Sequence, residues 1–497
     1  MSPTLVILTL AIYLALLFIV ARRAARGSGG VAFFTGGRAT PRMVAAVAMV
    51  GAAMSGVSYI SIPGSVLADG YSYLQTTLGF FVGYLIIAFI LVPLYYRLGV
   101  VSLYEYLNHR FGLVAHRTGA WIFFISKLLA ASLRAFVVCV VLQGLLFDRY
   151  GLPFALNAAI MVALVWLYTR RGGVRSVVWV EVLKTVVMVS SIVACVLFIV
   201  RGLGLSAGEA LRSIGEHATS EVLFCDDVLD RRYFWKQFVA GILLVVAMTG
   251  LDQDMMQTVL SCRNRRDAQR SLLLSIVVQM GVIVLFLMLG TLLYIYVESQ
   301  GITSSEEGMP LLNAEGDVVV ARGDDLFGYV ATQGALPTAV GVLFLLGLAA
   351  STYSAAGSAL TALTTSFTLD ILHGGERDDK RLTQLRRRVH LLIAVAMAII
   401  MVLFYECSTM GVITLIFTMA SYTYGPLLGM FLFGLTTQRT VAAKAIPIIA
   451  LAAPVLSYLI ATHSAAWFGG YTFSYEILLV NAALTYAGMY VASRGRR

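Results

Sequence analysis

The chain has 497 residues, of which 59% are hydrophobic and only 12% charged, and its formal net charge is +10 at pH 7. Soluble domains carry about a quarter of their residues as charged side chains, so this composition excludes an ordinary soluble enzyme, and nothing in it resembles a nucleic-acid-binding module. Apolar runs of about 17–25 residues recur along the whole sequence. They predict an all-α polytopic membrane protein in contact with the lipid bilayer.

A window of about twenty apolar residues predicts about thirteen transmembrane helices. The first is an extra N-terminal helix, and we expect it to be retained because Arg22 and Arg23, rather than a small-residue cleavage site, follow its apolar core. Two further helices are expected within 441–493. The predicted spans lie near 4–21, 43–64, 74–96, 118–147, 153–169, 176–201, 235–251, 271–297, 337–370, 389–405, 409–435, 441–462 and 471–493.

The loops between these spans alternate between basic and acidic. The loop at 298–336 is acidic, whereas arginines gather at 22–42, 97–117, 170–175, 263–270 and 381–388, and again at the end of the chain. By the positive-inside rule, this pattern predicts an external N-terminus and a cytoplasmic C-terminus in the cell membrane. An odd number of spans places the two termini on opposite sides, which agrees with this prediction.

Two spans contain helix-breaking residues at membrane depth. The stretch GAAMSGVSYISIPG covers residues 51–64, and MTGLDQD covers residues 248–254. Breaks of this kind survive where the freed backbone groups line a cavity or bind ions. Because they lie five spans apart, they predict a five-plus-five inverted repeat in one transporter domain, with halves at 42–201 and 235–435. The alternative is that these glycines only let helices pack closely.

A stripe of hydroxyls marks the ninth span. Ser351, Ser354 and Ser358 are spaced at i, i+3 and i+7, so they share one helix face. Several hydroxyl oxygens on one face suit a hard monovalent cation. Here too, small residues could serve only to bring helices together.

Four stretches together resemble the sodium:solute symporter family, which includes bacterial proline, sugar and sialic acid carriers. They are FFTGGRATPRMVAAVAMVGAAMSG at 33–56, LYEYLNHRFG at 103–112, GGVRSVVWVEVLK at 172–184 and AASTYSAAGSALTALTTSFTLDI at 349–371. The resemblance implies a LeuT-like core in spans two to eleven, with one helix before it and two after it. It also implies alternating access without enzymatic activity or an organic cofactor, with a small solute as substrate and Na⁺ as the coupling ion.

The same resemblance implies a set of cation ligands. The main sodium site would use the backbone carbonyls of Gly51, Met54 and Ser351, together with the hydroxyl of Ser354. The next family position is usually Ser or Thr, and it is Ala355 here, so one ligand is missing.

Some relatives build a second sodium site, whose positions fall here on Glu181, Gly357 and Ser358. Lys184 stands where the family has Gln, and it shares a helix face with Glu181. Three readings stay open. The two residues form an internal ion pair, or the ammonium replaces the sodium ion and makes the carrier proton-coupled or sodium-independent, or Glu181 adds a ligand to ordinary sodium coupling.

The solute is predicted from Arg134, an arginine at membrane depth with Lys127 two turns earlier on the same face. A planar guanidinium suits a carboxylate, so an organic anion is favoured. The alternative is an arginine paired with Glu181, Asp252 or Asp254. The positions that bind sugars or proline in the family are not retained. The candidate solute-binding residues are Ser55, Ser58, Thr76, Thr77, Arg134, Gln279, Tyr422 and Tyr424.

Rival classes fit the sequence less well. A membrane-embedded enzyme needs a nucleophile or metal constellation at depth, yet the six histidines fall in loops or near span ends. A channel needs no broken helices. Cys225 and Cys407 could both face outside, but spacing alone does not assign a disulfide.

Overall fold

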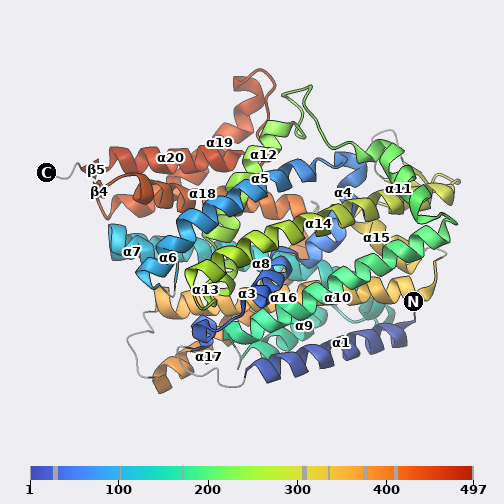
Figure 1. Cartoon of the computed structure of the whole chain (residues 1–497), viewed down its shortest axis with the longest axis horizontal. Coiled ribbons are helices and arrows are strands. Elements are labelled where there is room, and N and C mark those ends of the chain that lie inside the picture. Colours follow the sequence, from blue (N-terminus) through green and yellow to red (C-terminus); the bar gives the residue numbers. More distant parts are fainter. Residues whose placement is uncertain are drawn as a thin grey trace.

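The computed structural model describes residues 2–25, 32–100, 102–170, 173–304, 310–333, 336–372, 379–407 and 412–494. Long helices lie roughly side by side and make up most of the molecule (Figure 1). The start of α1 and the end of α20 lie at opposite ends of this bundle, as an odd number of spans requires.

Nine described helices are long and apolar enough to cross a membrane, or up to eleven if each of two bent pairs is one span. The long elements are α1 (Pro3–Ala24), α5 (Tyr73–Ile86) continued through η2 (Ile87–Leu91) and α6 (Val92–Leu98), α8 (Leu113–Leu142) continued through η3 (Gln143–Phe147) and η4 (Asp148–Tyr150), α10 (Gly173–Gly202), α14 (Arg265–Ser299), α16 (Thr338–Ser366) continued through η7 (Phe367–Ile371), α17 (Asp379–Cys407), α18 (Val412–Thr436) and α19 (Ala445–Trp467).

Two shorter apolar helices occupy the remaining predicted spans. They are α9 (Phe154–Thr169) and α20 (Ile477–Val491), with 16 and 15 residues. At a rise of about 1.5 Å per residue, each is shorter than the roughly 30 Å hydrocarbon core. The predicted number of thirteen spans therefore depends on two helices that are short for a crossing.

The remaining elements are small and lie mainly in the connections. They are α2 (Ala32–Thr35), η1 (Gly36–Arg38), α7 (Glu105–Phe111), α11 (Ala207–Glu216), η5 (Ala218–Ser220) and α15 (Gly323–Thr332), with strands β1 (Thr303–Ser304), β2 (Leu311–Leu312), β3 (Val318–Val320), β4 (Thr440–Val441) and β5 (Ser493–Arg494). The first three strands form an antiparallel sheet in the order β1-β2-β3, and β4 pairs antiparallel with β5.

Several helices extend further than the apolar runs predict. The prediction placed helix starts at 118, 271 and 389, whereas α8, α14 and α17 begin at residues 113, 265 and 379. Hydropathy marks only the part of a helix that lies in lipid. The extra turns carry charged residues, and the Asn264 side chain caps the first turn of α14 by accepting from the Asp267 backbone N–H at 2.8 Å.

Both predicted helix breaks are present. The helices α3 (Arg42–Ala53) and α4 (Gly56–Asp69) meet at 60°, because Met54 and Ser55 have extended backbones. Between α12 (Phe234–Val245), continued by η6 (Val246–Gly250), and α13 (Gln253–Leu260), the bend is 67°.

The second break is held by groups from neighbouring elements. The Tyr95 hydroxyl donates to the Gly250 carbonyl at 2.9 Å, and the Tyr104 hydroxyl donates to the Leu251 carbonyl at 3.0 Å. Asp252 caps α13 by accepting from the Asp254 backbone N–H at 2.9 Å. These contacts satisfy the backbone groups that the break frees, which an interrupted helix at membrane depth requires.

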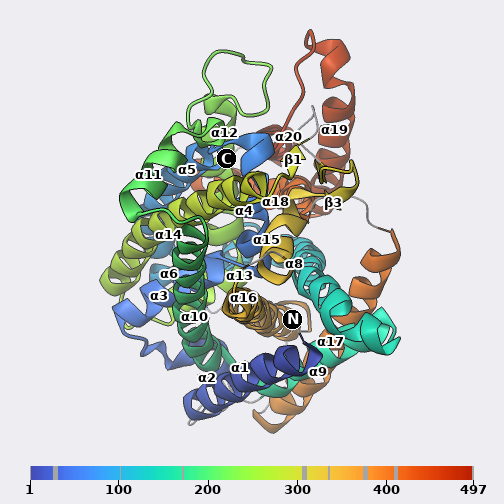
Figure 2. The ribbon, with the colours of Figure 1, turned by 90° about the vertical axis from the view of Figure 1, so that its right-hand side faces the viewer.

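Helix α16 lies near the centre of the bundle and packs against α10, α8, α1 and α9 (Figure 2). Every residue from Gly347 to Ser366 is buried. Small side chains allow this crowding. At Gly357, an added Cβ would lie 1.7 Å from the hydroxyl of Tyr168, which itself donates to the Tyr353 carbonyl at 2.7 Å.

Candidate functional site

A central cavity lies where the two broken helices meet. Its volume is about 90 Å³, several times the space that one water molecule needs. It is therefore suited to a small solute. The lining residues come from both breaks and from α5, α8, α14 and α18: Ala52, Ala53, Met54, Ser55, Val57, Ser58, Tyr73, Phe80, Tyr84, Lys127, Arg134, Leu244, Val245, Met248, Thr249, Met255, Gln279, Ile416 and Phe417.

Beside the first break, three buried side-chain oxygen atoms have no partner among the described residues, those of Glu181, Thr352 and Ser354. The Ser354 hydroxyl is close enough to the Glu181 carboxylate to interact with it. However, neither Ser354 Oγ nor Glu181 Oε1 has a hydrogen-bond partner within the described part of the chain. Buried polar atoms are nearly always satisfied in native structures, so these two oxygens are candidate ligands for a cation.

Gly51 brings the broken helix against these oxygens. An added Cβ at Gly51 would lie 2.8 Å from Glu181 Oε2 and 2.5 Å from Thr185 Oγ1. Only glycine fits this approach of α3 to α10. The Gly51 carbonyl accepts from the Met54 backbone N–H at 3.1 Å, which closes the last turn of α3. The structure thus gathers Gly51, Met54, Glu181 and Ser354 at the break.

Lys184 is paired with Glu181 but only weakly satisfied. Its Nζ lies 3.1 Å from Glu181 Oε2, and both side chains are fully buried, with no exposed surface. An ammonium has three donors, and no second acceptor for Lys184 is present among the described residues. The side chains point into the protein rather than into lipid.

The predicted second cation position is arranged differently. The close approach of Tyr168 leaves no room for a side chain at Gly357. The Ser358 hydroxyl donates to Asp254 Oδ1. Ser351, from the same stripe, donates its hydroxyl to the Gly347 carbonyl at 2.7 Å. Of the three serines in the stripe, Ser354 alone has an unsatisfied hydroxyl.

A second buried charge cluster, which sequence reasoning missed as a unit, lies at the other break. The Lys127 ammonium is 3.0 Å from Asp252 Oδ2 and 2.8 Å from Asp254 Oδ2. The Tyr424 hydroxyl donates to Asp252 at 2.7 Å, and Ser358 donates to Asp254. The sequence analysis considered each of the five residues separately, but only the fold shows that α8, α13, α16 and α18 bring them together. They are Lys127, Asp252, Asp254, Ser358 and Tyr424. We call these five residues the aspartate cluster.

Arg134 lines the central cavity, where it is half-buried. Its pairing with Glu181, Asp252 or Asp254 was an alternative in the sequence, but Arg134 has no ion pair with any described residue. A guanidinium that faces a cavity without a counterion favours an anionic ligand.

The other predicted solute-binding residues fall into two groups. Ser55, Ser58 and Gln279 line the central cavity, and Gln279 accepts from the Tyr84 hydroxyl at 3.2 Å. Thr77 donates instead to the Tyr73 carbonyl at 2.8 Å, while Tyr424 belongs to the aspartate cluster.

Thr76 and Tyr422 line a second cavity, which lies beside the end of α4 and the loop before α12. Tyr73 and Phe417 line both cavities and so form the partition between them. These two aromatic residues had no signal in the sequence beyond hydrophobicity, because their role depends on how α5 and α18 pack in the fold.

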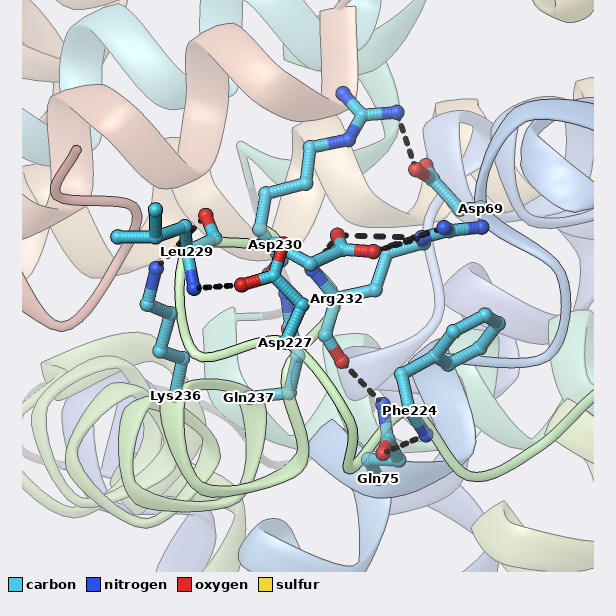
Figure 3. A network of polar contacts seen from close by, with 10 residues as sticks. Asp69, Gln75, Phe224, Asp227, Leu229, Asp230, Arg232, Lys236 and Gln237 are labelled. Atoms are coloured by element: carbon cyan, nitrogen blue, oxygen red, sulfur yellow. Dashed lines mark hydrogen bonds and ion pairs between the residues drawn. The ribbon is translucent and has the colours of Figure 1, made fainter. Parts of the chain in front are cut away.

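A network of charged side chains holds the rim of this second cavity (Figure 3). Arg231 pairs with Asp69, and Arg232 pairs with Asp230 at 2.8 Å. Hydrogen bonds from the Arg232 side chain hold the pKa of Asp230 below its usual range. The Gln75 amide donates to the Arg232 carbonyl at 2.8 Å. These bonds tie the loop before α12 to the ends of α4 and α5.

The fold and the site define a polytopic helical protein with two broken helices around a central cavity. The family model of the sodium:solute symporter family matches residues 33–447, and the chain belongs to this family. The resemblance predicted from the sequence is therefore confirmed.

Two relatives illustrate how distant the known members are. The human sodium/iodide cotransporter is 26% identical over 427 residues, which cover 81% of this chain and 60% of that protein. Human sodium-coupled monocarboxylate transporter 2 is 24% identical over 421 residues, or 81% of this chain and 63% of that protein. The chain spans less than two thirds of the length of these relatives.

Solved structures confirm the predicted fold class. A Na⁺-coupled sialic acid symporter in a substrate-bound outward-open state matches with a TM-score of 0.81 at 15% identity, covering 99% of both chains. Mhp1, a nucleobase-cation-symport-1 family transporter, matches in a closed conformation with a TM-score of 0.56 at 12% identity, covering 92% of both chains. The relatives and structures named here are transporters, which agrees with the prediction that the chain is not an enzyme.

Proposed function

We propose that this protein is a secondary active transporter that couples the entry of Na⁺ to symport of a small monovalent anion, such as a monocarboxylate, by alternating access. The observation that carries the proposal is Arg134, an unpaired guanidinium in the central cavity. The proposal also includes repeats at 42–201 and 235–435, an external N-terminus and a cytoplasmic C-terminus in the cell membrane.

The cation is proposed to bind between α3, α10 and α16. Glu181 Oε1 and Ser354 Oγ provide two unsatisfied oxygens, and the carbonyls of Gly51, Met54 and Ser351 complete the set that the family resemblance implies. A carboxylate and a hydroxyl are ligands that suit a hard monovalent cation. Because these helices come from both repeats, a bound cation would hold the repeats together in the conformation that accepts solute.

The anion is proposed from charge and from the relatives. Lys184 is neutralised by Glu181, and Lys127 lies between two aspartates. Of the two bases that line the cavity, Lys127 and Arg134, only Arg134 forms no ion pair with a described acid. Iodide and monocarboxylates, named in the relatives, are both monovalent anions. One anion on Arg134 would pair that charge, with Ser55, Ser58 and Gln279 available for its polar groups.

A second candidate function rests on Lys184. Its ammonium is fully buried beside the same unsatisfied oxygens and makes one bond. A lysine on a flexible stem can occupy the position of a monovalent cation. In this version, the carrier is sodium-independent or proton-coupled, and Lys184 does what Na⁺ does in the relatives.

Uptake into proteoliposomes distinguishes these proposals. A labelled monocarboxylate is supplied with an inward gradient of Na⁺ or of choline. Neutral amide analogues are added as competitors, and a site for anions should not bind them. Sodium coupling predicts uptake that needs Na⁺ and is lost in Arg134→Gln. The exposed Arg149 near the end of the same helical segment provides the control, since Arg149→Gln should transport normally. Uptake that is equal in choline supports the Lys184 version. Sodium-dependent uptake that Lys184→Gln leaves unchanged refutes it.

A further inference from the structure

A third, polar cavity lies away from the proposed transport site, beside α17 and the end of α9. These two helices pack against each other (Figure 2). Its volume is about 200 Å³. The residues that line it are Phe33, Trp166, Arg170, Arg386, Arg387 and His390. Three of these six carry a guanidinium, and no described acidic residue lines the cavity. An anion-sized space bordered by three like charges favours an anionic ligand.

Arg386 is the centre of this cavity. The residue is only 7% exposed, yet it has no ion pair or hydrogen bond with any described residue. Its guanidinium lies over the ring of Phe33, 4.0 Å from the ring centre. This cation–π contact offsets part of the cost of burial, but it supplies no counter-charge. Buried charges are normally paired, and no described residue supplies a counter-charge for Arg386, so an anionic group from a ligand would fit beside it.

The other two arginines increase this excess of positive charge. Arg387 repels Arg386 electrostatically. Arg170 lies over the Trp166 ring at 5.1 Å and forms no ion pair within the described residues. Stacking on an aromatic face leaves the N–H edge of a guanidinium free. Such edges bind the oxygens of a phosphate group in pairs.

The wall of the cavity is rigid. His390 is 2% exposed, and its two ring nitrogens lie 2.8 Å from the hydroxyls of Thr169 and Thr364. These contacts tie α17 to α9 and α16. The arginines on α17 are therefore presented from a fixed backbone rather than from a loose loop.

An apolar groove adjoins this cavity and shares Arg170 with it. The groove runs between α1 and α9, and Phe18, Ile19 and Leu167 line it together with Arg22. Ile19 and Leu167 are 50% and 40% exposed. A phosphate on the arginines would thus have an apolar surface beside it, as the headgroup of a lipid with its acyl chain requires.

We propose that Arg170, Arg386 and Arg387 bind the phosphate group of an anionic phospholipid, whose acyl chain lies in the groove between α1 and α9. The site is on the face that the positive-inside rule assigns to the cytoplasm, where anionic lipids attract basic residues. A free phosphate ion offers the same chemistry without the chain. The inference is independent of the transported solute and of the coupling ion.

The test measures thermal unfolding of the full chain in nanodiscs. Discs of phosphatidylcholine alone are compared with discs that contain phosphatidylglycerol, and inorganic phosphate is added to the former in a separate arm. The variants are Arg386→Gln, the double variant Arg170→Gln with Arg386→Gln, and Arg388→Gln. Arg388 is exposed on the same helix and does not line the cavity, so it is the matched control.

The proposal predicts that phosphatidylglycerol raises the unfolding temperature of the wild type and of Arg388→Gln, but not that of the double variant. The apparent lipid affinity should fall roughly tenfold or more with Arg386→Gln. In phosphatidylcholine, Arg386→Gln should be as stable as the wild type or more stable, because it removes an unpaired buried charge.

Stabilisation by inorganic phosphate alone would support the same arginine site with a soluble ion as its ligand. Three results would overturn the proposal. In the first, phosphatidylglycerol stabilises the wild type and the double variant equally. In the second, neither phosphatidylglycerol nor phosphate stabilises the wild type. In the third, Arg386→Gln is destabilised to the same extent in both kinds of disc, which would make Arg386 a structural contact of Phe33.

Discussion

Two buried amine–acid groups flank the central cavity, and they differ in how fully their atoms are paired. In the aspartate cluster, Lys127 contacts both carboxylates, and two hydroxyls donate to the same acids. In the Glu181–Lys184 pair, one bond joins the two side chains, and Glu181 Oε1 and Ser354 Oγ have no partner. A cluster whose polar atoms all have partners stabilises a helix break, whereas a cluster with unpaired oxygen atoms can still bind a ligand. The difference separates a structural group from a proposed binding site.

The largest effect is expected from removing the two amines separately. Lys127→Met leaves two buried carboxylates without their cation, and breaking a buried pair costs about 3–5 kcal/mol. Lys184→Met leaves only Glu181 unpaired, so it should cost less. Added Na⁺ should restore the stability of Lys184→Met, because the ion can replace the ammonium beside Glu181 and Ser354. Thermal unfolding in detergent, with NaCl or choline chloride, measures both effects.

The comparison would fail if the two variants lost the same stability, or if Na⁺ rescued Lys127→Met as well. Adding Asp254→Asn to Lys127→Met serves as a check, since removing one surplus carboxylate should recover part of the loss.

A smaller effect is expected at Gly51, where an added Cβ would lie within 2.8 Å of both Glu181 Oε2 and Thr185 Oγ1. Gly51→Ala overpacks the contact of α3 with α10, which costs about 1–3 kcal/mol, and should abolish sodium-dependent uptake. Gly144 has open space around its Cβ position, so Gly144→Ala is the control and should transport normally. Full uptake by Gly51→Ala would show that this approach of the helices is not needed.

Ser354→Ala is expected to act on ion binding rather than on folding. Its hydroxyl is buried without a partner, so its removal should leave thermal stability unchanged or slightly higher. The apparent affinity for Na⁺ should fall roughly tenfold, as when a ligand worth about 1.4 kcal/mol is lost. Ser351→Ala removes a hydroxyl that donates within its own helix and should keep the sodium affinity. The sodium dependence of the initial uptake rate measures both.

The smallest effect concerns pH at the outer rim. Hydrogen bonds from Arg232 hold the pKa of Asp230 below its usual range. The stabilisation is therefore complete above the ordinary carboxyl pKa of about 3.9 and is lost as pH falls through the lower pKa of the folded protein. A slight loss of protease resistance in the 221–233 loop is expected at acidic pH. In Asp230→Asn, protease sensitivity of this loop should be the same at neutral and at acidic pH. If this variant loses resistance in acid as the wild type does, a group other than Asp230 causes the effect.

Much of the fold could be predicted from the sequence, because span position depends on local hydropathy and the breaks at Gly51–Gly64 and Gly250 carry helix-breaking residues. The approach of Gly51 to Glu181 was reachable only through the family resemblance. The aspartate cluster could not be predicted from the sequence, because Lys127, Asp254 and Tyr424 are far apart in the chain and meet only through packing. The sequence predicted that Arg386 lies in a basic loop, whereas the structure places it in α17, with its guanidinium buried against Phe33. Hydropathy missed this because the first turns of α17 are polar.

Cys225 is free and exposed among the described residues, whereas the side chain of Cys407 lies outside them.

Equilibrium binding of radioactive sodium to the purified protein tests the central claim most directly, because it needs no knowledge of the solute. The account predicts saturable binding that Ser354→Ala and Glu181→Gln weaken, while Ser358→Ala, in the saturated aspartate cluster, retains it. Sodium binding that is unaffected by Ser354→Ala and Glu181→Gln, or that is lost only in Ser358→Ala, would contradict the placement of the cation beside the first break.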